Sequence, residues 1–140
     1  MKEKEEKAQK LYLEFQMLSQ QIKHLENQND AVSNQLLELM STAQTLEEMN
    51  NLKENAQILV PISSGIYAKA ELKDGRNFIV NVGANTALVK DLESTKFIIS
   101  EQIKEMRKIQ ESLVKELQSH TEKASSLEQE INNIASEIQK

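Results

Sequence analysis

Apolar residues recur about every 3.5 positions in two ladders, one in each end of the chain, and both ladders step alternately by four and three residues. The first ladder is Leu11, Phe15, Leu18, Ile22, Leu25, Asn29, Val32, Leu36, Leu39, Ala43, Leu46 and Asn50. The second ladder is Ile99, Ile103, Met106, Gln110, Leu113, Leu117, His120, Ala124, Leu127, Ile131, Ile134 and Ile138. An apolar seam with this period is typical of a coiled-coil helix. We therefore expect two long helices, at about residues 5–54 and 91–139.

The stretch between the ladders has a period of two. All three glycines and the only proline lie there, which favours turns. Apolar and polar residues alternate from Ile66 to Lys73, as in a strand with one buried face. We expect four short strands in two successive hairpins at about residues 57–89, with Asp74 and Gly75 as a tight hairpin turn. Pro61 places the first strand at a sheet edge or a bulge, because proline cannot donate a hydrogen bond.

So short an insert makes the two helices fold back antiparallel, and two registers fit their seams. Pairing residue n with 149 − n places Asn29 opposite His120, so that two polar seam residues share one layer. Pairing n with 142 − n places Asn29 opposite Leu113 and His120 opposite Ile22, which leaves both polar groups without partners. We predict the first register, because polar layers commonly fix register.

The fold class that follows is mainly α with a small β module. We expect a long antiparallel coiled coil formed within one chain, with its two helices joined by two β-hairpins. The hairpins and helices together make a single domain over residues 1–140.

The composition excludes several classes of function. The formal net charge is −5 and no basic stretch is present, which argues against a nucleic-acid ligand. No apolar run is long enough to span a membrane, and the charged N-terminus lacks the apolar core of a signal peptide. The absence of cysteine excludes disulfides and thiolate metal sites, and it is consistent with a cytoplasmic protein.

No set of residues in the sequence predicts catalysis. His24 falls at an outward helix position and His120 falls in the seam, so the two histidines do not share a helix face. We expect no catalytic, cofactor or metal site, and therefore a protein that is not an enzyme.

Three apolar residues near the start of the first helix fall outside its seam. Leu13 and Met17 lie four residues apart and form one exposed stripe, with Tyr12 beside it. Scattered surface hydrophobes are the alternative interpretation, since they are common. We predict an adaptable apolar surface for a variable partner. Fraying of the helix ends would add five neighbouring seam residues: Phe15, Leu18, Ile131, Ile134 and Ile138.

The four strands are too few and too short to be stable as an independent sheet, and their edges need partners. Packing of the strands onto their own helix ends alone is the alternative. We predict that they join strands of other subunits through eight residues: Ile58, Val60, Ile62, Ile66, Ala68, Phe78, Val80 and Val82.

This pattern of a long helix, two hairpins and a second long helix resembles the alpha class of prefoldin. The most specific stretch is Val60-Pro61-Ile62-Ser63-Ser64-Gly65-Ile66-Tyr67, followed later by Val80-Asn81-Val82-Gly83. With the long helices on either side, the resemblance covers nearly the whole chain. Two hairpins match the alpha class, whereas the beta class resembles this pattern with only one.

The resemblance implies an ATP-independent co-chaperone, in which the strands form a barrel-like base carrying six coiled-coil arms. The arm tips bind unfolded polypeptide and deliver it to a group II chaperonin. The implied partners are beta-class prefoldin subunits in an archaeal heterohexamer, whereas gamma prefoldin-like homologues self-assemble into filaments. The alternative function is that of a structural coiled-coil protein, a filament or scaffold subunit with little client role.

Overall fold

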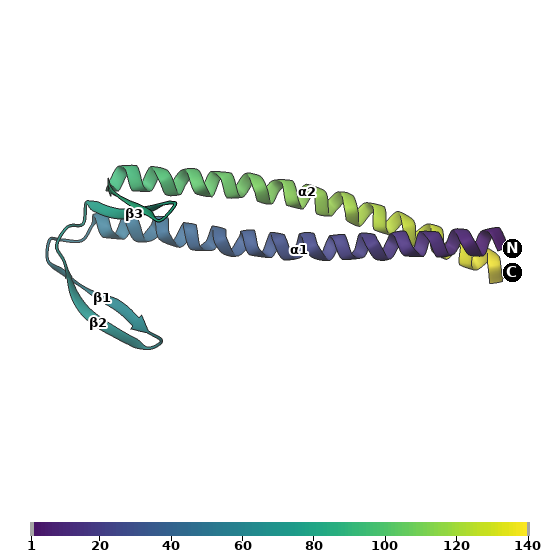
Figure 1. The fold of residues 1–140 in the computed structure, drawn as a ribbon, viewed down its shortest axis with the longest axis horizontal. Coiled ribbons are helices and arrows are strands. Elements are labelled where there is room, and N and C mark those ends of the chain that lie inside the picture. Colours follow the sequence, from purple (N-terminus) through teal and green to yellow (C-terminus); the bar gives the residue numbers. More distant parts are fainter. Residues whose placement is uncertain (1, 140) are drawn as a thin grey trace. The chain divides into compact units, whose positions relative to one another are not determined.

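The computed structural model describes residues 2–139, so residues 1 and 140 of the predicted domain lie outside the described part. Two long helices, α1 (Lys2–Asn50) and α2 (Leu92–Gln139), enclose four strands in the sequence (Figure 1). The strands are β1 (Ala56–Ser63), β2 (Ile66–Leu72), β3 (Asn77–Gly83) and β4 (Thr86–Asp91). This order confirms the predicted fold of two long helices with two β-hairpins between them.

The chain divides into two compact units. The terminal unit contains the residues up to Gln35 and those from Met106 onward, which belong to the two helices alone. The hairpin unit contains residues 36–105, with all four strands and the adjoining helix ends.

The seam of the helices is where the sequence placed it. The most buried side chains of α1 are Leu18, Leu25, Leu36 and Leu46, and every other ladder position up to Ala43 is at least half-buried. All ladder positions of α2 from Ile99 to Ile138 are likewise buried or half-buried. The last step of the first ladder is wrong, since Met49 is half-buried and Asn50, where α1 ends, is exposed.

The predicted register of the two helices is also wrong. In the terminal unit the Gln110 side-chain amide donates a 2.8 Å hydrogen bond to the Ser33 hydroxyl, and Lys4 pairs with Glu137 at 3.2 Å. The two residue numbers add to 143 in the first pair and to 141 in the second, whereas the prediction required 149. The error is about seven residues, or roughly 10 Å at ~1.5 Å per residue. The observed pairing is the alternative register, close to a sum of 142.

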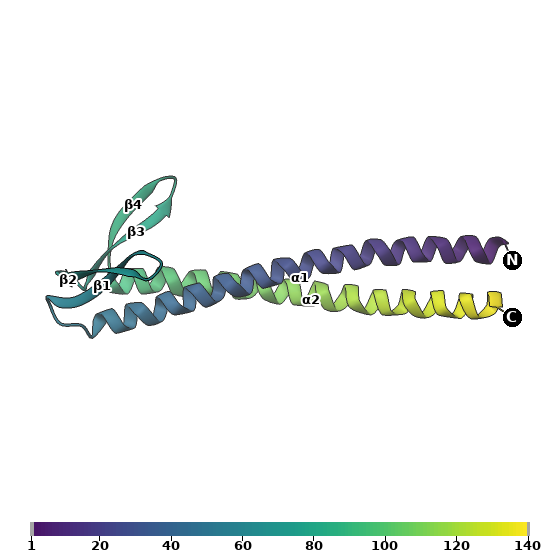
Figure 2. The same ribbon diagram turned by 90° about the horizontal axis from the view of Figure 1, so that it is seen from below.

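The two hairpins are separate two-stranded antiparallel sheets (Figures 1 and 2). In β1–β2 the register shifts directly after Pro61, which confirms the predicted bulge or edge position of this proline. In β3–β4 the loop residues Ala84 and Asn85 both have positive φ, at 51° and 58°. Positive φ at both loop residues is the geometry that matches the twist of the flanking strands.

Asp74 and Gly75 do not form a hairpin turn, which corrects the prediction. They connect β2 to β3, and these strands do not pair within the described residues. The Asp74 carboxylate accepts hydrogen bonds from the backbone N–H groups of Arg76 and Asn77 and from the Asn77 side chain. These bonds, led by that of the Asn77 side chain, lower the Asp74 pKa below its ordinary value of 3.8.

Local capping sets where the helices meet the strands. Asn55, directly before β1, has a φ of 66°, and its backbone N–H donates a 2.8 Å hydrogen bond to the Leu72 carbonyl. Asp91 caps α2, accepting a 2.7 Å hydrogen bond from the Ser94 backbone N–H. Hydrogen bonds from Ser94 lower the Asp91 pKa below 3.8. In the same unit, Lys96 pairs with Glu47 at 2.7 Å, which raises the Lys96 pKa.

Candidate functional site

Both ends of the chain meet at the same end of the terminal unit. The Lys4–Glu137 ion pair joins the first turn of α1 to the last turn of α2. Figures 1 and 2 both show the two helix ends side by side. A surface built here therefore combines residues that are more than a hundred positions apart in the sequence.

The three off-seam apolar residues are exposed at this end, as predicted. The exposed fractions are 53% for Tyr12, 60% for Leu13 and 64% for Met17. Tyr12 and Leu13 line a shallow hollow of about 470 Å³, together with Ala8, Gln9 and Ile131. The sequence did not single out Ala8 and Gln9. Ala8 lies one step before the first ladder and is half-buried, so extending the ladder backward by one step would have found it.

The seam residues assigned to the same surface lie in a different setting. Leu18 is only 7% exposed and packs with Ala124 and Leu127, while Phe15 packs against this cluster. The other three seam residues of the set are half-buried: Ile131, Ile134 and Ile138. While the helices are paired, the open apolar surface therefore consists mainly of Tyr12, Leu13 and Met17.

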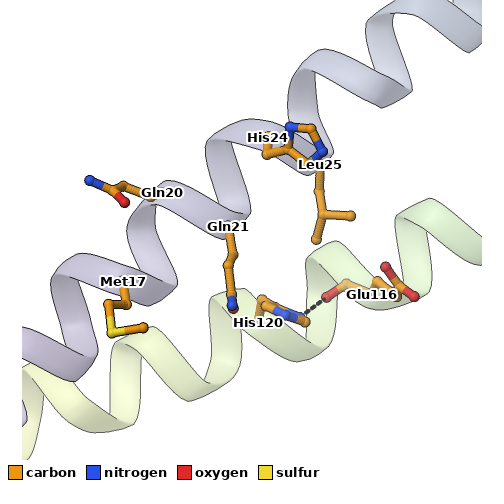
Figure 3. A pocket seen from close by; sticks show the side chains of 7 residues that line it. All are labelled: Met17, Gln20, Gln21, His24, Leu25, Glu116 and His120. Atoms are coloured by element: carbon orange, nitrogen blue, oxygen red, sulfur yellow. Dashed lines mark hydrogen bonds between the residues drawn. The ribbon is translucent and has the colours of Figure 1, made fainter.

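Met17 also borders a second hollow, of about 420 Å³, which Figure 3 shows from close by. Gln21 and Leu25 point from α1 toward α2, where His120 and Glu116 lie. The remaining residues that line this hollow are Gln20 and His24. Five of the seven lining residues are polar and the other two, Met17 and Leu25, are apolar, so this surface offers both hydrogen-bonding and apolar groups.

The structure does not bring Asn29 and His120 into one layer. The His120 Nδ1 atom lies 2.8 Å from the Glu116 carbonyl oxygen, one turn earlier on the same helix, so Nδ1 donates in this arrangement. The Asn29 Oδ1 atom is buried and has no hydrogen-bond partner among the described residues. The predicted polar layer of Asn29 and His120 is therefore wrong. His120 instead hydrogen-bonds to a backbone carbonyl of its own helix.

The hairpins expose apolar side chains on both faces. Of the eight residues assigned to strand joining, Val60, Ile62, Ile66 and Val82 are exposed, and the other four are half-buried. The opposite faces also carry exposed apolar residues among polar ones, which the sequence reasoning missed. Ile79 and Val89 form a cross-strand pair with exposed fractions of 80% and 72%. On β1–β2, Leu59 and Tyr67 are similarly exposed.

Other kinds of site were also considered across residues 2–139. No three His, Cys, Asp or Glu side chains in this part of the chain are arranged to hold a metal ion. Neither described helix has a stretch with the length and hydrophobicity needed to cross a membrane.

Comparison with known proteins decides the family. The family model described as "Prefoldin subunit" matches residues 18–137, which include all four strands and most of both helices. The chain belongs to the prefoldin family. Prefoldins are chaperones that assemble into oligomers, and the relatives place this chain in the alpha class.

Two archaeal relatives illustrate the similarity. Prefoldin subunit alpha of Methanococcus vannielii is 25% identical over 96% of this chain and 90% of its own length. Prefoldin subunit alpha of Thermococcus onnurineus is 34% identical over 75% of this chain and 72% of its own length. A chain of the filamentous prefoldin of Methanocaldococcus jannaschii, solved by cryo-EM, has the same fold. It superposes with a TM-score of 0.72 at 20% identity, covering 81% of this chain and 93% of that one.

Proposed function

We propose that this prefoldin is a subunit of an ATP-independent holdase that binds non-native polypeptides at the paired helix ends. The observation that carries the proposal is the exposure of Tyr12 and Leu13, which line a hollow with Ile131, and of Met17 one turn further along α1. Non-native chains expose apolar segments of variable sequence. A flexible methionine and a shallow apolar hollow suit such partners, because they adapt to many shapes.

Binding of this kind depends on several copies of a weak site. One surface of three exposed side chains gives little affinity alone, but several copies on one assembly raise the effective concentration at each client. The net charge of −5 favours arms that repel one another and stay apart around the client.

We further propose that the hairpins supply the assembly, forming a barrel-like base with strands of other subunits. Exposed apolar residues on both faces of each hairpin support this proposal, since a two-stranded sheet in water is marginally stable. Beta-class prefoldin subunits are the proposed partners in a cytoplasmic heterohexamer. A group II chaperonin is the proposed recipient of the bound polypeptide.

The test is suppression of aggregation of a chemically denatured client without ATP, by the chain alone or with beta-class subunits. The double variant Leu13→Ser with Met17→Ser should lose most of this activity. The matched control is Leu37→Ser with Met40→Ser, which removes another exposed Leu and Met from α1, in the hairpin unit. The control should retain the activity, and both variants should keep the oligomer mass of the unchanged chain.

Full activity in both variants would show that the client does not bind at the helix ends. Equal loss in both would show that any exposed apolar residue on α1 contributes, which would also contradict a dedicated surface.

A structural role is the second candidate, with the chain as a subunit of a filament or scaffold. The fold neighbour from Methanocaldococcus jannaschii is filamentous, and hairpin faces that are apolar on both sides suit repeated self-association. Electron microscopy of the purified chain distinguishes the two. Long filaments without client protection would favour the structural role, and closed particles that protect a client would favour the holdase.

A further inference from the structure

The connector between β2 and β3 is held to the ends of both helices. On one side of it, the Leu72 carbonyl accepts a 2.8 Å hydrogen bond from the backbone N–H of Asn55, which lies between α1 and β1. On the other side, the Arg76 carbonyl accepts a 2.8 Å hydrogen bond from the backbone N–H of Leu92, the first residue of α2. A change in the length of the connector's backbone would therefore affect both attachments.

The connector also contains the only Asp–Gly pair in the chain, at Asp74 and Gly75. In such a pair the glycine nitrogen can attack the aspartate side-chain carboxyl carbon, because glycine has no side chain to block the approach. A nitrogen–carbon bond forms, the carboxyl hydroxyl leaves as water with the amide proton, and a succinimide ring results. Water then adds to the ring. Its addition at the backbone carbonyl leaves the chain running through the aspartate side chain, as isoaspartate.

Hydrogen bonds hold the Asp74 carboxyl group away from this reaction. Its Oδ1 atom accepts from the backbone N–H groups of Arg76 at 2.9 Å and Asn77 at 3.3 Å, and its Oδ2 atom accepts from the Asn77 side-chain amide at 2.9 Å. Turning the carboxyl carbon toward the Gly75 nitrogen breaks these bonds. The bonds, led by that of the Asn77 side chain, also lower the Asp74 pKa. The group is therefore ionised, and a carboxylate has no hydroxyl to lose.

We propose that Asp74–Gly75 is a latent isoaspartate site, and that the hydrogen bonds from Arg76 and Asn77 keep it in the normal aspartyl form. The Asn77 side chain is the replaceable part of this protection, because the other two donors belong to the backbone. Conversion would add one carbon to the backbone of the connector and disturb its attachments to both helices. The site lies in the hairpin unit and does not depend on whether the helix ends bind clients.

Incubation of the full chain at neutral pH, at a temperature below its unfolding, tests the proposal. Isoaspartate has the same mass as aspartate, so it is counted by enzymatic methylation of its carboxyl group and located by electron-transfer mass spectrometry. The reference is a synthetic peptide of residues 70–80, which has the same Asp–Gly pair without the folded connector. The full chain should form isoaspartate at Asp74 at least about tenfold more slowly than the peptide, since hydrogen bonds to a charged group must break first.

Substitutions in the full chain test the role of the Asn77 side chain. Asn77→Ala removes the bond to Oδ2 and should raise the rate about tenfold. The matched control is Asn81→Ala, which removes another side-chain hydrogen bond of β3, from the Gly83 backbone N–H, and should leave the rate unchanged. Adding Gly75→Ala to Asn77→Ala should abolish the increase, because a methyl group hinders the attack. This methyl group would meet its nearest neighbour, a Leu72 methyl carbon, at 3.4 Å, an ordinary contact.

Two results would overturn the proposal. Equal rates in the full chain and in the peptide would show that the folded connector gives no protection. Equal rates in Asn77→Ala and Asn81→Ala would show that the Asn77 side chain does not hold the carboxyl group. Circular dichroism checks that each variant keeps the helix content of the unchanged chain. The comparison with the peptide needs no variant, so it decides even if Asn77→Ala does not fold.

Discussion

The terminal unit and the hairpin unit use their apolar residues in opposite ways. In the terminal unit the seam residues of one helix are covered by the other helix, and the Leu18 cluster is the clearest case. In the hairpins, Ile79 and Val89 pair with each other yet remain 80% and 72% exposed. Two helices of one chain can bury each other's apolar side chains, whereas a two-stranded hairpin leaves both faces and both edges open. The comparison indicates that the hairpins, more than the helices, require other subunits.

Removing the hairpins should have the largest effect. Replacing residues 57–89 with a short flexible linker removes every exposed strand face, so we expect assembly to be abolished. The helix pair should remain, because its seam lies within the chain. Sedimentation velocity measures the assembly and circular dichroism measures the helix content. A uniform hexamer surviving this deletion would refute the strand-based assembly and erase the contrast between the two units.

A buried seam residue should matter next. Leu18→Ala leaves a gap in the Leu18 cluster and should lower the free energy of unfolding by about 2–3 kcal/mol. Thermal or urea unfolding followed by circular dichroism measures the loss. Leu13→Ala is the control five residues away, at an exposed position, and should cost less than about 0.5 kcal/mol. Similar losses at both positions would mean that the seam is not the core of the terminal unit.

The observed register of the two helices can be tested by removing one hydrogen bond between them. Ser33→Ala removes the acceptor of the Gln110 amide and should cost about 1 kcal/mol. Ser19→Ala is the matched control, because Ser19 also follows a seam residue by one position but is exposed. If the two variants unfold at the same urea concentration, Ser33 and Gln110 do not hold the helices in the observed register.

How far the sequence determines this fold differs between features. The seam could be predicted almost position by position, because the spacing of apolar residues along one helix marks which positions are buried. The register could not, since a heptad pattern shifted by one repeat still matches apolar residues to apolar residues. The choice then depended on the hydrogen bonds of single side chains. Gln110 bonded to Ser33, a residue outside the ladder, and His120 bonded to its own backbone.

The candidate surfaces show the same limit. Tyr12, Leu13 and Met17 could be found from the ladder because they depart from it. Ile131 was assigned to the same surface from the second ladder, and Ala8 could have been found by extending the first ladder backward by one step. In the strands, alternation predicted one apolar face correctly. It directed attention away from Leu59, Tyr67, Ile79 and Val89, which lie on the face expected to be wet.

The smallest expected effect is the pH dependence of the α2 cap. The Asp91 pKa is lowered in the folded chain, so the cap stabilises the fold above about pH 4 and its contribution is lost as the pH falls through the lowered value. Asp91→Asn should therefore flatten the decline in melting temperature between about pH 5 and pH 3. The pKa of Asp74 is lowered as well, so in this variant Asp74 still causes part of the decline in melting temperature. An unchanged slope would remove Asp91 as a contributor.

The central claim is that the helices cover each other's apolar residues, whereas the strands leave theirs exposed. The most direct test of this claim is the mass of the purified chain, measured by light scattering. The mass is measured for the chain alone and for the chain mixed with a beta-class prefoldin subunit. The chain weighs 16.0 kDa. We predict a discrete assembly of several chains in at least one of the two samples. A single 16.0 kDa species in both would show that the exposed hairpin faces need no partner, and it would contradict the account.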